Sequence, residues 1–201
     1  MLKLKMTYPV FLALSLLLIS CGNDKKNKNA EKNGNKEQSK ELEGMKRVSL
    51  KEYGLPFKIS IPEKSPARQM PPTNVKLNRT TGKVELKSGE KGEKYYMVIY
   101  RAEKGIKGFK KEITEGPESL MYDVEIVEET EKKIIYKNKL QDEDKEFMHF
   151  IVLKDIKGTT YALRSFHNGQ FSKPHVDRML KSVKSITPVS SNSSEKEEKA
   201  S

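Results

Sequence analysis

The sequence predicts an α+β domain in which an antiparallel β-sheet is covered by helices on both faces, as in an α/β/α sandwich. Three observations support this fold class. Several segments alternate apolar and polar residues with a period of two, the pattern of strands with one buried face. Two further segments are apolar on both faces and therefore need cover above and below the sheet. An amphipathic segment near residue 180 supplies a helix for that cover.

Composition sets the boundaries of this domain. Residues 22–44 contain almost no apolar side chain before Leu42, and the C-terminal segment is rich in Ser, Lys and Glu. Such segments cannot bury enough apolar surface to offset the entropy lost on ordering. We therefore expect residues 1–20 to be a signal peptide, 21–46 a flexible tether, 47–187 a single domain and 188–201 a disordered tail.

Three segments are expected to be strands with one buried face. In PFKISIP, Phe57, Ile59 and Ile61 alternate with Lys58 and Ser60. The segments GKVELKS and YDVEIVE repeat this alternation further along the chain. Alternation of this kind places one set of side chains in the core and the other in solvent.

Two segments are expected at the centre of the sheet, because KYYMVIYR and EFMHFIVLK are apolar on both faces. The segments KKIIYKNKL and TTYALRSF flank the second of them and complete the set of strands. Short polar turns at 142–144 and 155–158 join these three successive strands, which predicts an antiparallel meander.

Two helices are expected. In the segment 172–186, Val176, Met179, Leu180 and Val183 form one apolar stripe, and Ser172 is a suitable N-cap. A shorter helix is expected in IKGFKKEITEG, which Gly-Pro terminates.

The N-terminus indicates export and lipid anchoring. Two lysines precede an apolar run of about ten residues, which is too short for a membrane span of about 20. The tetrapeptide at the end of this run, Leu18-Ile19-Ser20-Cys21, resembles the lipobox of bacterial lipoproteins and contains the only cysteine of the chain. The resemblance implies that Cys21 becomes the N-terminal residue and carries a diacylglycerol and an acyl chain. The alternative is a soluble exported protein cut near Ser20, with a free thiol.

The expected location is the bacterial cell envelope, where the lipid on Cys21 holds the protein to a membrane. Ser-Cys-Gly-Asn followed by a run rich in Lys and Asn resembles lipoproteins of Bacteroidetes-type bacteria, which often reside in the outer membrane. The formal net charge is +11, and residues 46–187 hold 29 basic against 20 acidic side chains. This excess is typical of a lysine-rich solvated surface, and beside an anionic membrane it could also attract an acidic envelope protein or an anionic glycan or lipid as partner. Export argues against nucleic acid.

The start GLPFKISIPE, the antiparallel meander and the closing helix that ends in MLKSVKSI resemble the PsbP-like superfamily. This superfamily includes extrinsic subunits of photosystem II, a Ran-binding nuclear import factor and many bacterial lipoproteins. The resemblance covers residues 50–187 and implies the same sandwich. Because the superfamily shares no catalytic motif, it implies no catalytic residue for this chain.

The candidate chemical groups are few. His167, His175 and Asp177 are ligand types that suit a divalent metal, although their spacing matches no known motif. His149 lies within an apolar strand and is expected to be a core residue. The acidic cluster at 141–146 lacks the glycine of a calcium loop, which favours a hairpin turn. No nucleophile, zinc-protease or phosphate-binding motif is present in the sequence.

One further segment is a candidate contact. The stretch 62–74 is rich in proline and has no strand pattern. Met70, Pro71 and Pro72 are expected to form an exposed loop that either contacts a partner or is a plain connector.

The function that the sequence favours is a non-catalytic binding or assembly module for an envelope protein, glycan or lipid. It would need no cofactor beyond the covalent lipid on Cys21. The alternative is a metal-binding protein or an envelope hydrolase that uses His167, His175 and Asp177.

Overall fold

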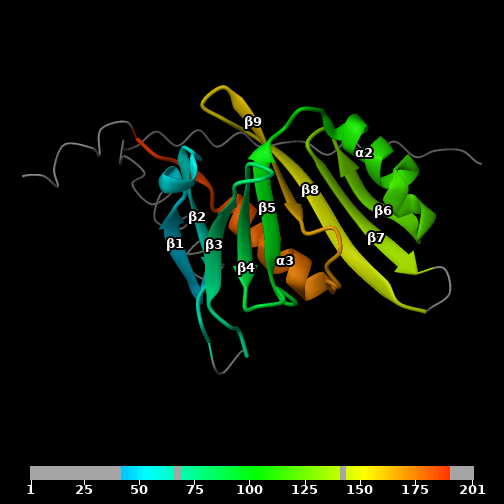
Figure 1. Cartoon of the computed structure of the whole chain (residues 1–201), viewed down its shortest axis with the longest axis horizontal. Helices are drawn as coiled ribbons and strands as arrows, with labels where there is room; N and C mark the ends of the chain where they lie inside the picture. The colour runs from blue at the N-terminus through cyan, green and yellow to red at the C-terminus, as the bar shows by residue number, and fades with distance from the viewer. Residues whose placement is uncertain (1–41, 66–68, 141–143, 191–201) are drawn as a thin grey trace, which may run out of the picture.

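The computed structural model describes residues 42–65, 69–140 and 144–190 (Figure 1). The expected signal peptide, Cys21, the tether up to residue 41, part of the acidic turn (141–143) and the tail from residue 191 lie outside the described residues. The elements are β1 (Met45–Ser49), η1 (Lys51–Tyr53), β2 (Phe57–Pro62), β3 (Thr73–Asn78), β4 (Lys83–Ser88), β5 (Tyr96–Arg101), α2 (Ile106–Glu115), η3 (Pro117–Leu120), β6 (Tyr122–Thr130), β7 (Lys133–Leu140), β8 (Glu146–Ile156), β9 (Thr159–Ser165), α3 (Lys173–Lys184) and β10 (Thr187–Pro188).

A seven-stranded antiparallel sheet forms the main layer, with the strand order β3-β4-β5-β9-β8-β7-β6. The α+β class is therefore confirmed. Strands β5 and β8, which are apolar on both faces, have a neighbour on each side, as expected. The meander β7-β8-β9 is also present, and its second turn places Lys157 and Gly158 at φ 50° and 77°. Positive φ at both positions is typical of tight hairpin turns between twisted strands.

A second, three-stranded sheet was not expected from the sequence. Its order is β1-β2-β10, with β2 in the middle. Strand β10 pairs Pro188 with Phe57, and the adjacent Val189 is buried and donates its backbone N–H to the carbonyl of Pro56. The fold therefore extends from Met45 to Val189, two residues beyond the predicted domain at each end. The polar composition of both termini concealed these short edge strands.

Strand β3 was also missed, because two prolines precede it and its apolar side chains are only Val75 and Leu77. It lies at the edge of the main sheet and pairs only with β4. An edge strand needs few apolar residues, since its outer side faces solvent.

Helix α3 lies behind the main sheet in Figure 1 and contacts β8 and β9 of that sheet and β2 of the small sheet. Its buried side chains Val176, Met179 and Val183 join a core cluster with Phe57 of β2 and Phe150 of β8. The buried Tyr95 hydroxyl donates to Ser182 Oγ at 2.8 Å, which ties α3 to the chain just before β5. The other fully buried members of this cluster include Ile59, Ile61, Leu86, Met97, Ile99, Leu163 and Phe171.

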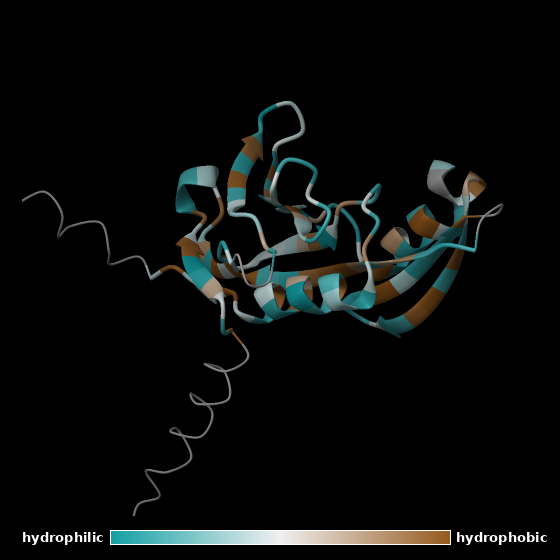
Figure 2. Ribbon diagram, turned by 90° about the horizontal axis from the view of Figure 1, so that it is seen from below, coloured by the Kyte–Doolittle hydropathy of each residue, from teal (hydrophilic) through white to brown (hydrophobic). Residues whose placement is uncertain are grey.

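Helix α2 packs over β6 and β7 (Figures 1 and 2). Its buried side chains are Ile106, Phe109 and Ile113. These residues form a second cluster with Ile134, Tyr136, Ile151, Leu153 and Ala162. Adjacent residues of β8 divide between the two clusters, because successive side chains of a strand point to opposite faces. In the described part of the chain, no helix is both long and apolar enough to cross a membrane.

Candidate anion-binding site

The candidate site lies on the sheet face that α2 covers only in part. Arg164 of β9 is paired with Ile151 of β8 and with Val98 of β5. Ile151 packs against α2, so Arg164 emerges on the same face, next to the helix. Tyr100 of β5 and Lys83 of β4 share this face by the alternation of the strands. The fold thus brings polar side chains from three strands to the edge of α2.

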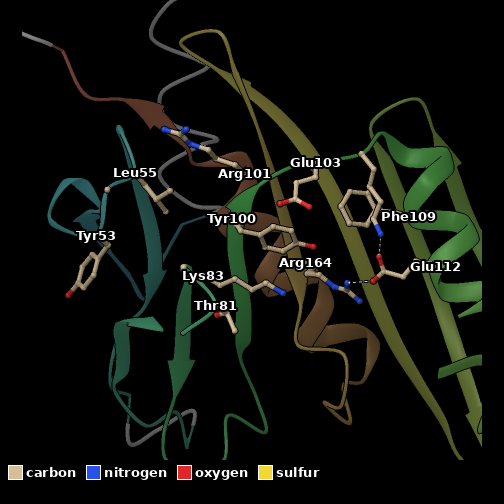
Figure 3. A pocket seen from close by; sticks show the side chains of 13 residues that line it. Tyr53, Leu55, Thr81, Lys83, Tyr100, Arg101, Glu103, Phe109, Glu112 and Arg164 are labelled. Carbon is tan, nitrogen blue, oxygen red and sulfur yellow. Dashed lines mark hydrogen bonds and ion pairs between the residues drawn. The ribbon is translucent and has the colours of Figure 1, made fainter. Parts of the chain in front are cut away.

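These side chains line a cavity of about 460 Å³ between β4, β5, β9 and α2 (Figure 3). A ligand pocket usually measures about 300–1,000 Å³, so this volume suits a small molecule or one sugar of a chain. The charged lining residues are Lys83, Arg101, Lys104 and Arg164 against Glu103 and Glu112. The aromatic lining residues are Tyr53, Tyr100 and Phe109.

A second cavity of about 180 Å³ adjoins the first and shares Thr81, Lys83, Tyr100 and Arg164 with it. It continues along the sheet to Phe166 and His167. The shared residues place Arg164 between the two cavities.

Arg164 is the central group of the site. The residue is only 9% exposed, and its Nη1 donates to Glu112 Oε1 at 2.9 Å. Its Nη2 is buried and has no hydrogen-bond partner among the described residues. A buried donor left unpaired costs about 1–3 kcal/mol, and more when it is charged. Arg164 therefore carries one unsatisfied buried donor beside the two cavities.

The neighbouring cationic side chains differ in their interaction partners. Lys104 forms an ion pair with Glu112, whereas Lys83 Nζ lies 4.7 Å from the centre of the Tyr100 ring. Neither Lys83 nor Arg101 forms an ion pair with a described residue. The cavity thus has a positive charge that its own carboxylates do not neutralise.

Two of the three carboxylates that line the cavities, Glu112 and Glu85, are held in their charged form. Burial raises the pKa of Glu112, but hydrogen bonds and attraction from Lys104 and Arg164 outweigh it, so the pKa is lowered overall. The pKa of Glu85 is also lowered overall, because hydrogen bonds from Asn78 and Tyr96 outweigh burial. The negative charges of Glu112 and Glu85 therefore persist down to mildly acidic pH.

The three predicted metal ligands have separate roles. His175 Nδ1 accepts a hydrogen bond from the Ser172 backbone N–H at 3.3 Å and so caps α3. Asp177 pairs with Lys173 one turn away, and the His167 ring packs against Phe166. Within residues 42–65, 69–140 and 144–190, no three His, Cys, Asp or Glu side chains are placed to hold a metal ion.

The Met70-Pro71-Pro72 segment is exposed only in part. Met70 was expected in solvent but is 5% exposed, and its sulfur accepts a hydrogen bond from Ser88 Oγ at 3.3 Å. Pro71 and Pro72 are exposed. Because Met70 fills the space beside β4, only the two prolines remain available to a partner.

His149 is a core residue, as expected. It is buried between Tyr136 and Phe171, and its Nδ1 lies 3.1 Å from Ser165 Oγ. Burial, with Arg164 and His167 nearby, lowers its pKa to about 3. Ser165 Oγ also accepts a hydrogen bond from the backbone N–H of Phe150. This hydrogen bond joins β8 and β9 at the end of their paired region. Both residues are at most 1% exposed and are not open to a substrate.

One feature of the sequence indicates this site, although it was not among the candidate residues named above. In TTYALRSF, Arg164 is a charged residue on a strand whose other side chains between Tyr161 and Ser165 are buried. A buried charge without a local partner is expensive, which marks such a position as functional or ion-paired.

Compared with known proteins, the chain matches no family model and no curated protein.

Proposed function

We propose that this protein is a membrane-anchored envelope lipoprotein that binds a sugar carrying phosphate or carboxylate groups, without catalysing a reaction. The ligand belongs to an anionic glycan or to the headgroup of an anionic glycolipid. The observation that carries this proposal is Nη2 of Arg164, a buried and unpaired donor between two cavities.

The chemistry of the cavity favours an oxyanion. A guanidinium presents its donors in a planar fork that matches carboxylate and phosphate oxygens. Nη1 already donates a hydrogen bond to Glu112, which leaves Nη2 as the donor for the ligand. Lys83 is close enough to line the same space and adds a second positive charge.

The aromatic lining supports a sugar as the group that bears the charge. The Tyr100 ring lies beside Arg164 in the cavity, and its hydroxyl points toward the same space (Figure 3). A ring with a polar tip offers an apolar face and a hydrogen-bonding end. Such a surface suits a sugar, which combines C–H faces with hydroxyl groups.

We also propose that the domain is a PsbP-like sandwich, with α2 and α3 covering opposite faces of the main sheet. The division of β8 between the two core clusters supports this arrangement. The envelope location and the anchor rest on the lipobox-like sequence at Cys21. Two or more acyl chains would give stable anchoring at about 0.8 kcal/mol per buried CH₂.

The anchor has a direct test. We expect the wild-type protein to remain in the membrane fraction after a high-salt wash, and the C21S variant to be released. Intact-mass analysis should find the diacylglycerol and acyl masses on Cys21. An unmodified thiol on secreted protein would contradict the anchor.

The binding site is tested by calorimetry on the detergent-solubilised protein. One arm uses purified lipopolysaccharide and the other a soluble acidic polysaccharide, so that the two sources of the same chemistry are distinguished. We expect the K83Q variant to weaken binding about tenfold, since it removes one charge from a partly desolvated site. The R164K variant keeps the charge but loses the planar fork, and we expect a larger loss.

The matched control is K58Q, an exposed lysine of β2 in the other sheet. It changes the net charge as K83Q does but should leave binding unchanged. Equal binding by the wild type, K83Q and R164K in both arms would overturn the proposal. Circular dichroism and urea unfolding of R164K separate a loss of binding from a loss of folding.

A further inference from the structure

A third cavity, of about 460 Å³, lies on the other face of the main sheet, between the C-terminal half of α3, the beginning of β7 and the end of β8. Val152 of β8 and Leu180 and Val183 of α3 line it. Val152 is adjacent in sequence to Leu153, which packs toward α2, so Val152 points to the face on which α3 lies. The cavity is thus separated from the Arg164 site by the thickness of the sheet.

The apolar walls of this cavity are incompletely covered. Val152 and Leu180 are only half-buried, although both pack against the α3 core cluster. Ile135 of β7, opposite Phe150 in the strand pairing, is also half-buried on this side. The helix therefore leaves a band of aliphatic surface beside it.

Lysines surround this band. Lys132, Lys133, Lys154 and Lys184 line the cavity, with Asp155 as the acidic residue among the lining side chains. Lys132 pairs with Asp155 at 2.6 Å, and Lys133 pairs with Glu128 at 2.6 Å. Both of these lysines are therefore neutralised by carboxylates of the chain.

Lys154 differs from the paired lysines. Its Nζ donates to the carbonyl of Val183 at 3.0 Å, at the C-terminal end of α3, and forms no ion pair with a described carboxylate. An ammonium has three donors, so two remain after this bond. Lys154 therefore places a partly buried cation at the mouth of an apolar cavity.

We propose that this cavity binds a long-chain fatty acid, with the acyl chain against Val152, Leu180 and Val183 and the carboxylate at Lys154. Charge complementarity selects this occupant, because an apolar wall alone would accept any aliphatic group, whereas Lys154, which no described carboxylate neutralises, favours one that ends in an anion. This site does not depend on the proposed function, since it shares no residue with the Arg164 cavity.

The experiment measures displacement of a fluorescent fatty-acid probe from the purified protein by palmitate and by hexadecanol, which has the same chain length without the charge. We expect palmitate to displace the probe at lower concentration than hexadecanol. L180S should weaken palmitate binding about tenfold, the loss expected from one partly buried leucine. K154M keeps an apolar stem and should remove the preference for palmitate over hexadecanol.

Matched controls come from the same chain. L77S replaces an exposed leucine of β3 at the far edge of the sheet and should leave palmitate binding unchanged. K83Q should leave palmitate binding unchanged as well, and L180S should leave binding of the acidic polysaccharide unchanged.

Three outcomes would overturn the proposal. The first is absence of probe displacement by palmitate, and the second is equal palmitate binding by L180S and the wild type. The third is a dimer in sedimentation that L180S dissociates and palmitate does not, which would assign the aliphatic band to a second copy of the chain. Urea unfolding of each variant shows whether it is folded.

Discussion

Arg164 of β9 and Glu112 of α2 are joined by a hydrogen-bonded ion pair of 2.9 Å at the edge of the polar cavity. The ion pair holds α2 against the sheet at the edge of the apolar contacts of the helix. Phe109 of the same helix is buried on the core side of this edge. Lys104, just before the helix, completes a three-residue cluster around the Glu112 carboxylate. The stability of α2 should therefore depend on the charge of Glu112.

The first prediction concerns this carboxylate. Because the folded-state pKa of Glu112 is lowered overall, its contribution to stability is full above the ordinary pKa of glutamate and is lost as the pH falls through the lowered value. We expect the free energy of unfolding to fall between pH 5 and pH 3 by less in E112Q than in the wild type. Urea unfolding at both pH values measures the difference. E115Q, whose partner Lys111 is 3.8 Å away on the exposed side, should behave as the wild type does.

The second prediction concerns His149. Its folded-state pKa of about 3 lies below the ordinary value of 6.5, so the unfolded chain binds the proton more readily between these values. Stability is then full above pH 6.5 and declines as the pH falls toward 3, by up to roughly 1.4 kcal/mol per pH unit. H149F keeps a ring between Tyr136 and Phe171 and should flatten this decline. The slope of the free energy of unfolding against pH from 6.5 to 5 tests this prediction, in a range above the one used for Glu112.

An equal slope in H149F and the wild type would contradict the neutral state of His149. The control S165A removes the neighbouring hydroxyl but keeps the imidazole. It should lower stability by about 1–3 kcal/mol at every pH, because it leaves the Phe150 N–H without its acceptor.

The strands and helices with strong periodicity could be predicted from the sequence. Strands β5 and β8 are buried on both faces and occupy interior positions, and the stripe of Val176, Met179 and Val183 forms the buried face of α3. In these segments the local pattern and the tertiary contacts favour the same structure. Strands β1, β3 and β10 have no such pattern, since they are short or lie at sheet edges.

The site could not be predicted, because it depends on which strands become neighbours. Arg164 and Lys83 are 81 positions apart in the sequence and meet only because β5 pairs with β9 after α2 has crossed to the far edge of the sheet. The sequence suggested His167, His175 and Asp177 instead, since these residues are close along the chain. Proximity in sequence did not bring their side chains together, because His175 caps α3 and Asp177 pairs along it.

The third prediction concerns the buried hydrogen bond between Tyr95 and Ser182. Burial raises the pKa of the Tyr95 hydroxyl far above its ordinary value, so it remains a donor at all physiological pH values. We expect Y95F and S182A each to lower the free energy of unfolding by about 1–2 kcal/mol. In the double mutant the loss should be smaller than the sum, with a coupling of about 1 kcal/mol. Simple additivity would mean that the two hydroxyl groups do not stabilise each other.

The fourth prediction separates a structural role of His175 from a metal-binding one. His175 Nδ1 accepts the Ser172 N–H, so it serves α3 only when the imidazole is unprotonated. Burial, followed by Arg178 and Lys94, lowers its pKa and favours that state. We expect H175A to lower the free energy of unfolding by about 0.5–1 kcal/mol at pH 7, the usual loss for a helix cap. Elemental analysis of protein purified without chelators should give the same zinc content for H175A and the wild type. Stoichiometric zinc that disappears in H175A would instead assign His167, His175 and Asp177 to a metal site.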